Sequence, residues 1–311
     1  MGSANVIGMT TPKLSIATPQ GRMYAREPGG TPVHPSITNV IETLSADMEW
    51  WEALCAANAA IEHSPLLGDV HNMPRGRAKW ARERAAKDWL MGAAGRDRDA
   101  ASARGDLVHD YAEQWARREI GAATSEDVNT ARNDAVAGGA GAYLPHFEAF
   151  WAHWKPRVVA PEATVWNDTV GYAGTTDLLC EFTIRGRSVT AVLDWKTKKA
   201  LWKRNGEQRL DLKESTALQL AAAAFAEEMW VEGSGWAPMP FVPQIGVGVA
   251  IGPDGWAARQ YDIHRPAVWD TFAALRTAWG FKHGPATMTG RLQGPEHLIL
   301  PEPALQRQQS A

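Results

Sequence analysis

Residues 171–199 read GYAGTTDLLCEFTIRGRSVTAVLDWKTKK. The stretch contains two strand-like runs, one on each side of Arg185-Gly186-Arg187, in which apolar and polar residues alternate. A period of two is typical of β-strands, and a glycine between two such runs predicts a tight turn. The stretch therefore predicts a β-hairpin.

Three charged residues interrupt this hairpin: Asp177, Asp194 and Lys196. Because side chains alternate between the two faces of a strand, Asp194 and Lys196 share one face. A turn at residues 186–187 places Asp177 opposite Lys196, whereas a turn at residues 185–186 places it opposite Asp194. Both registers put the three charged groups on one face, so the sequence predicts a charged cluster without deciding between them.

The cluster follows the apolar run VTAVL of residues 189–193, where burial of charge is costly unless the groups are paired or used. A structural interpretation is a salt-bridge cluster at the end of the hairpin. A functional one is a cation site, because paired carboxylates offer the hard oxygen ligands that Mg²⁺ and Mn²⁺ prefer. A neighbouring lysine suits activation of a water or stabilisation of charge on a phosphate.

Around the hairpin, the sequence predicts a helical first half and a β-rich second half. Residues 1–35, rich in Pro, Gly and Thr, predict a flexible arm, and residues 36–156 carry helical periods. Residues 157–283 alternate strand-like runs with helices and predict an α/β core. Residues 284–311, rich in Pro and Gln, predict a disordered tail.

Three helices near the motifs are predicted from the same patterns. Helices over residues 79–94 and 97–120 are expected to be separated by Gly95. A further helix is expected over residues 215–230, after the hairpin.

Composition excludes several classes of protein. The chain has 311 residues, 45% hydrophobic and 22% charged, which is ordinary globular usage and argues against disorder or a coiled coil. A net charge of −3 excludes a histone-like polycation. No apolar run reaches the ~18 residues of a membrane span, and no signal peptide is evident. Two cysteines, Cys55 and Cys180, fit a reduced compartment, so a cytoplasmic protein without membrane contacts is expected.

Positive charge is concentrated in two segments. Residues 75–87 carry a net charge of +5, and residues 185–213 carry +6. Such runs are typical of solvated faces, but two of them also suit a groove that follows a phosphate backbone. The second run leaves the predicted strand just beyond Lys196. Its expected DNA contacts are Lys198, Lys199, Lys203 and Arg204.

Four motifs occur in a characteristic order: GDLVH at 105–109, GYAGTTD at 171–177, VLDWKT at 192–197 and LQLAAAAFA at 218–226. Together they resemble the PD-(D/E)XK nuclease superfamily, and within it the RecB-like exonucleases common in bacteriophages. The stretch HPSITNVIETLSADMEWWEA also resembles the opening of the phage members. The resemblance covers residues 34–230.

The resemblance implies a restriction-endonuclease-like α/β core, a mixed central sheet flanked by helices, with a helical N-terminal region. It implies a Mg²⁺- or Mn²⁺-dependent DNA exonuclease that hydrolyses phosphodiester bonds in phage DNA recombination or processing. DNA is the implied partner, together with a single-strand annealing or recombination protein. For a phage-encoded chain, the implied location is the host cell cytoplasm.

By position, the resemblance assigns a metal site to this chain. Asp177 and Asp194 match the metal-binding acids, and His109 matches the histidine that completes the metal shell. The backbone carbonyl of Trp195 is also implied to face the metal. The CRISPR-associated members bind an iron–sulfur cluster through four cysteines, and two cysteines exclude that cluster here.

The resemblance also assigns supporting residues. Lys196 matches the catalytic lysine, Gln219 the glutamine of the helix motif, and Glu162 the supporting acid of the preceding strand. One position departs from the pattern: Ala223 stands where the family has tyrosine, four residues after Gln219. That departure supports an alternative function, a DNA-binding scaffold that keeps the nuclease fold with little or no turnover.

Overall fold

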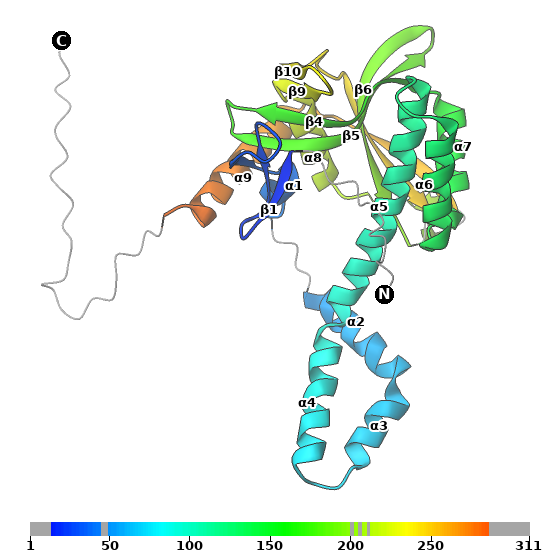
Figure 1. Cartoon of the computed structure of the whole chain (residues 1–311), viewed down its shortest axis with the longest axis vertical. Helices are drawn as coiled ribbons and strands as arrows, with labels where there is room; N and C mark the ends of the chain where they lie inside the picture. Colours follow the sequence, from blue (N-terminus) through cyan, green and yellow to red (C-terminus); the bar gives the residue numbers. More distant parts are fainter. Residues whose placement is uncertain (1–13, 45–48, 200–201, 205–206, 210–211, 286–311) are drawn as a thin grey trace, which may run out of the picture.

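The computed structural model of the protein describes residues 14–44, 49–199, 202–204, 207–209 and 212–285. The described chain is a mixed α/β structure, with one large sheet covered by helices on both faces and a helical arm that projects from it (Figure 1). Among the described residues, no helix has both the length and the apolar character needed to cross a membrane.

The large sheet has seven strands in the order β10-β9-β4-β5-β6-β11-β12. Neighbouring strands are antiparallel except β6 and β11, which are parallel. Parallel strands need a crossover connection, and the chain between β6 and β11 contains α8. The bounds are β4 Arg157–Asn167, β5 Tyr172–Ile184, β6 Arg187–Thr197, α8 Ser215–Ala224, β9 Glu228–Val231, β10 Gly235–Pro238, β11 Ile245–Gly252 and β12 Gly255–Tyr261.

The predicted hairpin is confirmed as β5 and β6, and its register is settled. Ile184 pairs with Arg187, so the turn is Arg185-Gly186. Both turn residues have positive φ, 51° and 76°, as a type I′ hairpin turn requires. Pairing continues to Leu178↔Leu193 and is the register that directs Asp177 towards Asp194.

Two helical layers bury the sheet. One face packs against α5, α6 and α7, and the other against α1, α8 and α9. Successive residues of the hairpin alternate between these layers: Leu178 and Leu193 contact the first, and Leu179 and Val192 the second. The bounds are α1 Ile37–Ile41, α5 Ala93–Glu119, α6 Ser125–Ala137, η1 Gly141–Tyr143, α7 Leu144–Trp154 and α9 Pro266–His283.

Aromatic side chains fill the core beneath α7. The Trp195 ring lies edge-on to Phe147 and Phe150, with centroids 5.5 Å and 5.4 Å apart. Edge-to-face pairs at this separation stabilise a core beyond their buried area. Trp195 therefore fixes the end of β6 in the core, while its neighbours Asp194 and Lys196 point to the opposite face.

The N-terminal prediction is wrong for residues 15–35, which form a three-stranded antiparallel sheet. Tyr24 is buried, and its hydroxyl lies 3.0 Å from Thr175 Oγ1 on β5. The segment gains order by burying Tyr24 and Ala25, with Tyr24 packed against Trp166 and Ala173 of the large sheet, which its Pro- and Gly-rich turns do not reveal. The strands are β1 Ser15–Thr18, β2 Gly21–Ala25 and β3 Pro32–Pro35. Residues 1–13, and 286–311 of the predicted tail, lie outside the described chain.

Two predicted helix boundaries are also wrong. Gly95 lies inside α5, and the preceding helix ends at Met91 with Gly92 as its C-cap. The helix after the hairpin ends at Ala224, because Met229 pairs with Val165 and so becomes part of the sheet. Tertiary pairing here outweighs the local helical preference.

Three helices form the arm: α2 Glu49–Glu62, α3 Ser64–Asn72 and α4 Arg77–Met91. They precede α5 and extend away from the large sheet (Figure 1). None of the described residues in these three helices is buried.

Candidate metal centre

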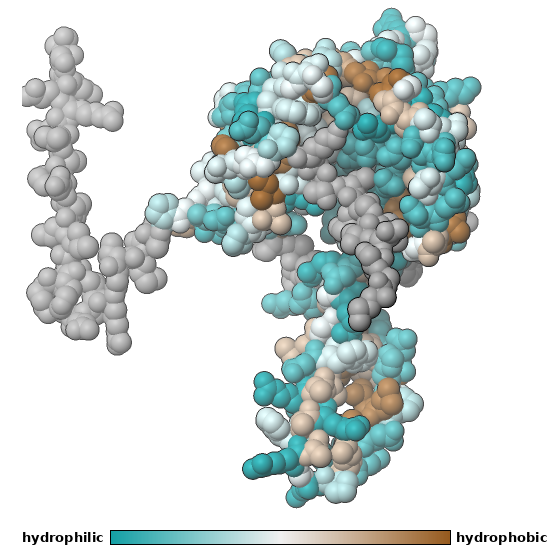
Figure 2. All heavy atoms as spheres, in the orientation of Figure 1, coloured by the Kyte–Doolittle hydropathy of each residue, from teal (hydrophilic) through white to brown (hydrophobic). Residues whose placement is uncertain are grey.

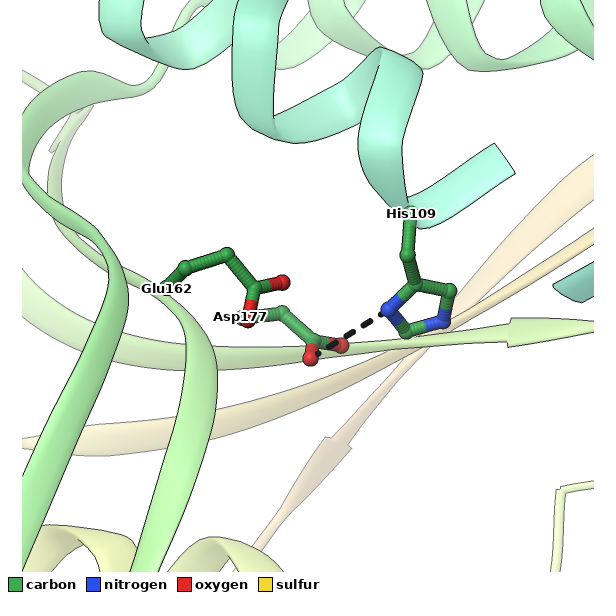
Figure 3. Close-up of side chains that lie close together, drawn as sticks. All are labelled: His109, Glu162 and Asp177. Atoms are coloured by element: carbon green, nitrogen blue, oxygen red, sulfur yellow. Dashed lines mark ion pairs between the residues drawn. The ribbon is translucent and has the colours of Figure 1, made fainter. Parts of the chain in front are cut away.

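Three side chains that can bind a cation converge from separate elements: His109 from α5, Glu162 from β4 and Asp177 from β5 (Figure 3). One ligand atom of each lies within 4.8 Å of the others. Two carboxylates and an imidazole form a mixed oxygen–nitrogen donor set that suits Mn²⁺ or Mg²⁺. The structure therefore contains a candidate metal centre at the edge where the hairpin meets α5.

Glu162 reaches this centre through an irregular strand. The pairs Pro161↔Leu178 and Ala163↔Thr176 place it across from Asp177, after a register shift between Val158 and Ala160. Its backbone φ is +45°, which is unusual for a residue with a side chain and costs on the order of 1–3 kcal/mol. Such local strain re-aims a side chain and is frequent at functional sites.

Gly105 lets α5 approach β6, the strand that carries Asp194. A Cβ atom at Gly105 would lie 3.3 Å from Thr197 Oγ1 at the end of β6, a tight contact. The glycine lies one helical turn before His109, so it allows the imidazole to reach Asp177. Nδ1 of His109 lies 3.5 Å from Oδ1 of Asp177. The spacing of the glycine and the histidine in GDLVH is thus explained: the glycine allows close packing one turn before the histidine that reaches Asp177.

The second acid, Asp194, belongs to a hydrogen-bonded group beside the centre. Lys196 Nζ donates to Asp194 Oδ1 at 2.9 Å and to Gln219 Oε1 at 3.1 Å, and Gln219 Nε2 donates to Asp194 Oδ1 at 2.5 Å. Oδ2 of Asp194 is buried and accepts no hydrogen bond from the described residues, although Lys196 Nζ lies 2.8 Å away. Gln219, on α8, therefore positions both the acid and the lysine.

Asp177 connects the two groups. Its Oδ2 accepts a hydrogen bond from the Trp195 backbone N–H at 2.5 Å, while its Oδ1 faces His109. The structure thus brings together the predicted residues Asp177, Asp194, Lys196, His109, Gln219 and Glu162. It is Glu162, predicted as the supporting acid, that joins His109 and Asp177 in the group of potential ligands, while Asp194 lies beside it. The role assigned to the Trp195 carbonyl stays a prediction.

Each charge in this cluster shifts the pKa values of its neighbours. Burial opposes ionisation of His109, but the carboxylate of Asp177 outweighs it and raises the imidazole pKa to about 9. Burial also opposes ionisation of Asp177, yet His109 and Lys196 hold its pKa below the ordinary value. Burial raises the pKa of Asp194 to about 6 and that of Glu162 well above its ordinary value. The cations of His109 and Lys196 thus compensate the carboxylates, and a divalent cation would take the place of the His109 proton.

Two cavities of different charge character flank the centre. The first, about 520 Å³, is lined by Glu113, Glu162 and Glu232 together with Arg117 and apolar residues of β4 and β9. The second, about 830 Å³, has a mainly basic lining, to which the hydrogen-bonded group contributes Lys196 and Gln219. Its cations are Arg98, Lys196, Lys198 and Lys213.

Arg98 is a residue of this lining that the sequence interpretation missed. It precedes Gly105 by seven residues and His109 by eleven, a spacing that places all three on one face of α5. Following the helix face of Gly105 and His109 two turns towards the N-terminus leads to Arg98, so the sequence contained this signal. Lys213 closes the basic run already recognised in the sequence.

The predicted DNA-binding segment is described only in part. Lys199 forms an ion pair with Asp97 of α5, and the Lys198 N–H donates to the Ile251 carbonyl at 2.9 Å. Lys203 and Arg204 lie in β7 (Trp202–Arg204), which pairs with β8 (Glu207–Arg209), and their side chains lie outside the described atoms. Their contact with DNA stays a prediction.

Ala223, the position that departs from the family pattern, is 2% exposed and packs in the layer between α8 and the sheet. A tyrosine ring would overfill this layer, because a well-packed core tolerates added volume poorly. The alanine therefore fits the packing of this chain.

Comparisons with known proteins do not identify the site. No family model matches the sequence, and no curated protein matches it. A solved structure titled "Crystal structure of SSO0001" aligns with 58% of this chain and 75% of its own length, at 16% sequence identity and a TM-score of 0.25. A TM-score this low does not establish a shared fold. The resemblance to PD-(D/E)XK nucleases therefore stays a prediction.

Proposed function

We propose that this protein is a metal-dependent deoxyribonuclease that hydrolyses phosphodiester bonds, and that it acts as an exonuclease in phage DNA recombination or processing. The observation that carries the proposal is the convergence of His109, Glu162 and Asp177 within 4.8 Å beside the ammonium group of Lys196. The restriction of attack to DNA ends rests on the sequence resemblance alone.

The residues present fit a divalent cation. Carboxylate oxygens and one imidazole nitrogen suit Mn²⁺ at least as well as Mg²⁺, since imidazole is a borderline ligand. Glu162 and Asp177 lie side by side, both half-buried; burial and the Asp177 carboxylate raise the pKa of Glu162, and a bound cation would favour its ionised form. The buried Oδ2 of Asp194 has unused acceptor capacity, so Asp194 can complete the ligand set.

A divalent ion bound there would supply Lewis-acid stabilisation of the phosphodiester and a lower pKa for a bound water. The protein contributes the arrangement around it. Lys196 holds a positive charge beside both aspartates, where it can orient the attacking water or stabilise negative charge on the phosphate. Gln219 holds the lysine in place, and the basic cavity beyond it can take the adjacent phosphates.

The direct test is a cleavage assay on end-labelled single-stranded and double-stranded DNA. Degradation is expected with Mn²⁺ or Mg²⁺ and none with EDTA, because without a cation the carboxylates offer no Lewis acid to polarise the phosphate. Release of mononucleotides or short products from the labelled end indicates an exonuclease, whereas internal fragments indicate an endonuclease. DNA binding without cleavage by either metal would contradict the nuclease proposal and favour the scaffold alternative.

Proton release on metal binding is a second expected result. At pH 7 the His109 imidazole, with a pKa of about 9, carries a proton that a metal ligand must lose. Mn²⁺ binding should therefore release about one proton from His109, plus any proton on Glu162, whose pKa is also raised. Calorimetry in buffers of different ionisation enthalpy measures this number.

The sign of the pH dependence follows. Manganese affinity should rise as the pH rises towards about 9 and level off above it, because His109 is then already neutral. His109→Gln removes the titrating group. Manganese binding to this variant should therefore be weaker and should release about one proton fewer than binding to the wild type. His153→Gln, on α7, is the matched control and should change neither quantity. Equal proton release by the wild type and His109→Gln would remove His109 from the ligand set.

A further inference from the structure

The arm of α2, α3 and α4 carries a surface that the candidate metal centre does not use. Figure 2 shows hydrophobic side chains next to hydrophilic ones on its surface, and none of its described residues is buried. The segment also contains the basic run of residues 75–87. An arm with this composition either binds a partner or leaves a costly surface in water.

One stripe of α4 combines an aromatic ring with cations. Arg77, Trp80, Arg84 and Lys87 are spaced by three, four and three residues, so they lie on one face of the helix. All four are exposed, and the Trp80 side chain is 63% exposed. The Arg84 guanidinium carbon lies 5.8 Å from the Trp80 ring centroid.

This stripe is not the face with which α4 packs. The partly buried residues of the helix are Lys79, Glu83, Ala86 and Leu90, about a third of a turn away. In an ordinary amphipathic helix a tryptophan lies on the packed face and the charges lie outside. Here the ring is instead placed among the charges.

The cations of the stripe are available to a ligand. Within the described ranges, Arg77 and Lys87 form no ion pair. Arg84 pairs with Asp88 at 3.9 Å, with both side chains 69% exposed, so that pair holds it only weakly.

We propose that the α4 stripe, Arg77, Trp80, Arg84 and Lys87, binds single-stranded nucleic acid, with Trp80 stacking on a base and the three cations contacting phosphates. Charge complementarity selects this occupant over a protein. The three cations match a chain whose repeated phosphates are all negative, and alternating rings and cations are the means by which proteins hold single strands without reading sequence. Stacking needs an unpaired base, so a duplex interior is excluded.

The stripe lies apart from the candidate metal centre. The α5 residues from Ala93 to His109 alone span about 24 Å, and α4 lies beyond their start. A cavity of about 860 Å³ lies between the arm and the end of β6, with Trp89, Arg96 and Lys199 in its lining. One strand can therefore contact the arm, this cavity and the centre in turn, and the stripe binds strands independently of whether the centre cleaves them.

The test measures affinity of the full-length protein for a fluorescein-labelled thymidine strand of about 30 nucleotides in EDTA, where metal-dependent cleavage does not occur. Trp80→Ala should weaken binding about 5- to 150-fold, the range expected for loss of one stacked base. Trp80→Phe should retain most of the affinity. The triple variant Arg77→Ala/Arg84→Ala/Lys87→Ala should lower the slope of log affinity against log salt by about 2, or about 0.7 per lost phosphate contact.

Controls separate this role from a general effect of charge or folding. Arg82→Ala removes an exposed cation from the opposite face of the same helix, and it should lower affinity less than Arg84→Ala. Alanine favours helices, so the variants should keep the helical circular-dichroism signal. On a 30-base-pair blunt duplex, or on an abasic strand of the same length, Trp80→Ala should bind as the wild type does.

Three results would overturn the proposal: unchanged affinity of Trp80→Ala, equal losses for Arg82→Ala and Arg84→Ala, or the same loss on abasic and thymidine strands. Unchanged DNA affinity together with an altered sedimentation mass for Trp80→Ala would assign the stripe to contacts between copies of the chain. Failure of the cleavage assay leaves these binding results unaffected, so the two proposals can fail separately.

Discussion

Asp177→Asn is expected to reduce metal-dependent DNA cleavage by a factor of about 10³ or more, because loss of Lewis-acid stabilisation costs several kcal/mol of the barrier. The carboxylate lies between His109, Glu162 and the Trp195 N–H, so no other described residue connects the same groups. Asparagine has the same shape and can still accept the Trp195 hydrogen bond. The fold should therefore persist, and the loss can be attributed to charge.

A second measurement distinguishes this effect from misfolding. The charge of Asp177 keeps the pKa of His109 at about 9 against the opposing effect of burial, so Asp177→Asn should lower that pKa. Titration of the imidazole by NMR follows it. Asp270→Asn, an exposed position on α9, is the control and should leave cleavage and the His109 titration unchanged. Wild-type cleavage by Asp177→Asn would show that the centre is not the site of hydrolysis.

Lys196→Ala is expected to slow cleavage of saturating DNA by about 10²–10³, the effect of removing one group that stabilises charge in a transition state. The Mn²⁺ affinity should not fall, since the lysine repels a cation and is not a ligand. Removing it also takes the ion-pair partner from the buried Asp194 and leaves only the Gln219 hydrogen bond, so the variant should be less stable than the wild type. A lower melting temperature without metal, partly restored by Mn²⁺, is the expected accompanying result.

Because Lys196→Ala changes both catalysis and stability, Lys196→Gln is the informative companion. Glutamine can still bond to Asp194 and Gln219 but carries no charge, so its cleavage rate should stay low while its stability recovers in part. Lys282→Ala removes an exposed lysine of α9 and should leave both properties unchanged. Full activity of Lys196→Gln would reduce the role of Lys196 to structural support.

The hairpin and its charged face were predictable, because alternation along a strand is a property of the local backbone. Gly186 identified the turn, and the odd spacing of Asp177, Asp194 and Lys196 placed the three on one face in either register. The choice of register was not predictable, since Arg185 also adopts positive φ, which is uncommon for a residue with a side chain.

The N-terminal sheet and β9 show where local patterns failed. The strands β1, β2 and β9 have only four or five residues each, too few to be recognised by their composition. Each becomes ordered by pairing with another strand or by packing against distant residues. Turn-forming residues in the N-terminal segment predicted a flexible arm, and helix-forming residues before β9 predicted that the helix continues to residue 230. Long-range pairing decided both.

The sequence by itself determined the α/β character, the hairpin and the identity of the charged residues, because these follow from side-chain chemistry and a period of two. The tertiary structure alone decided which of them meet. His109, Glu162 and Asp177 converge only because Gly105 lets α5 approach β6 and because strained backbone at Glu162 turns its side chain to the same place. Contacts between residues far apart in the chain depend on how whole helices and sheets pack, and no local pattern encodes that packing.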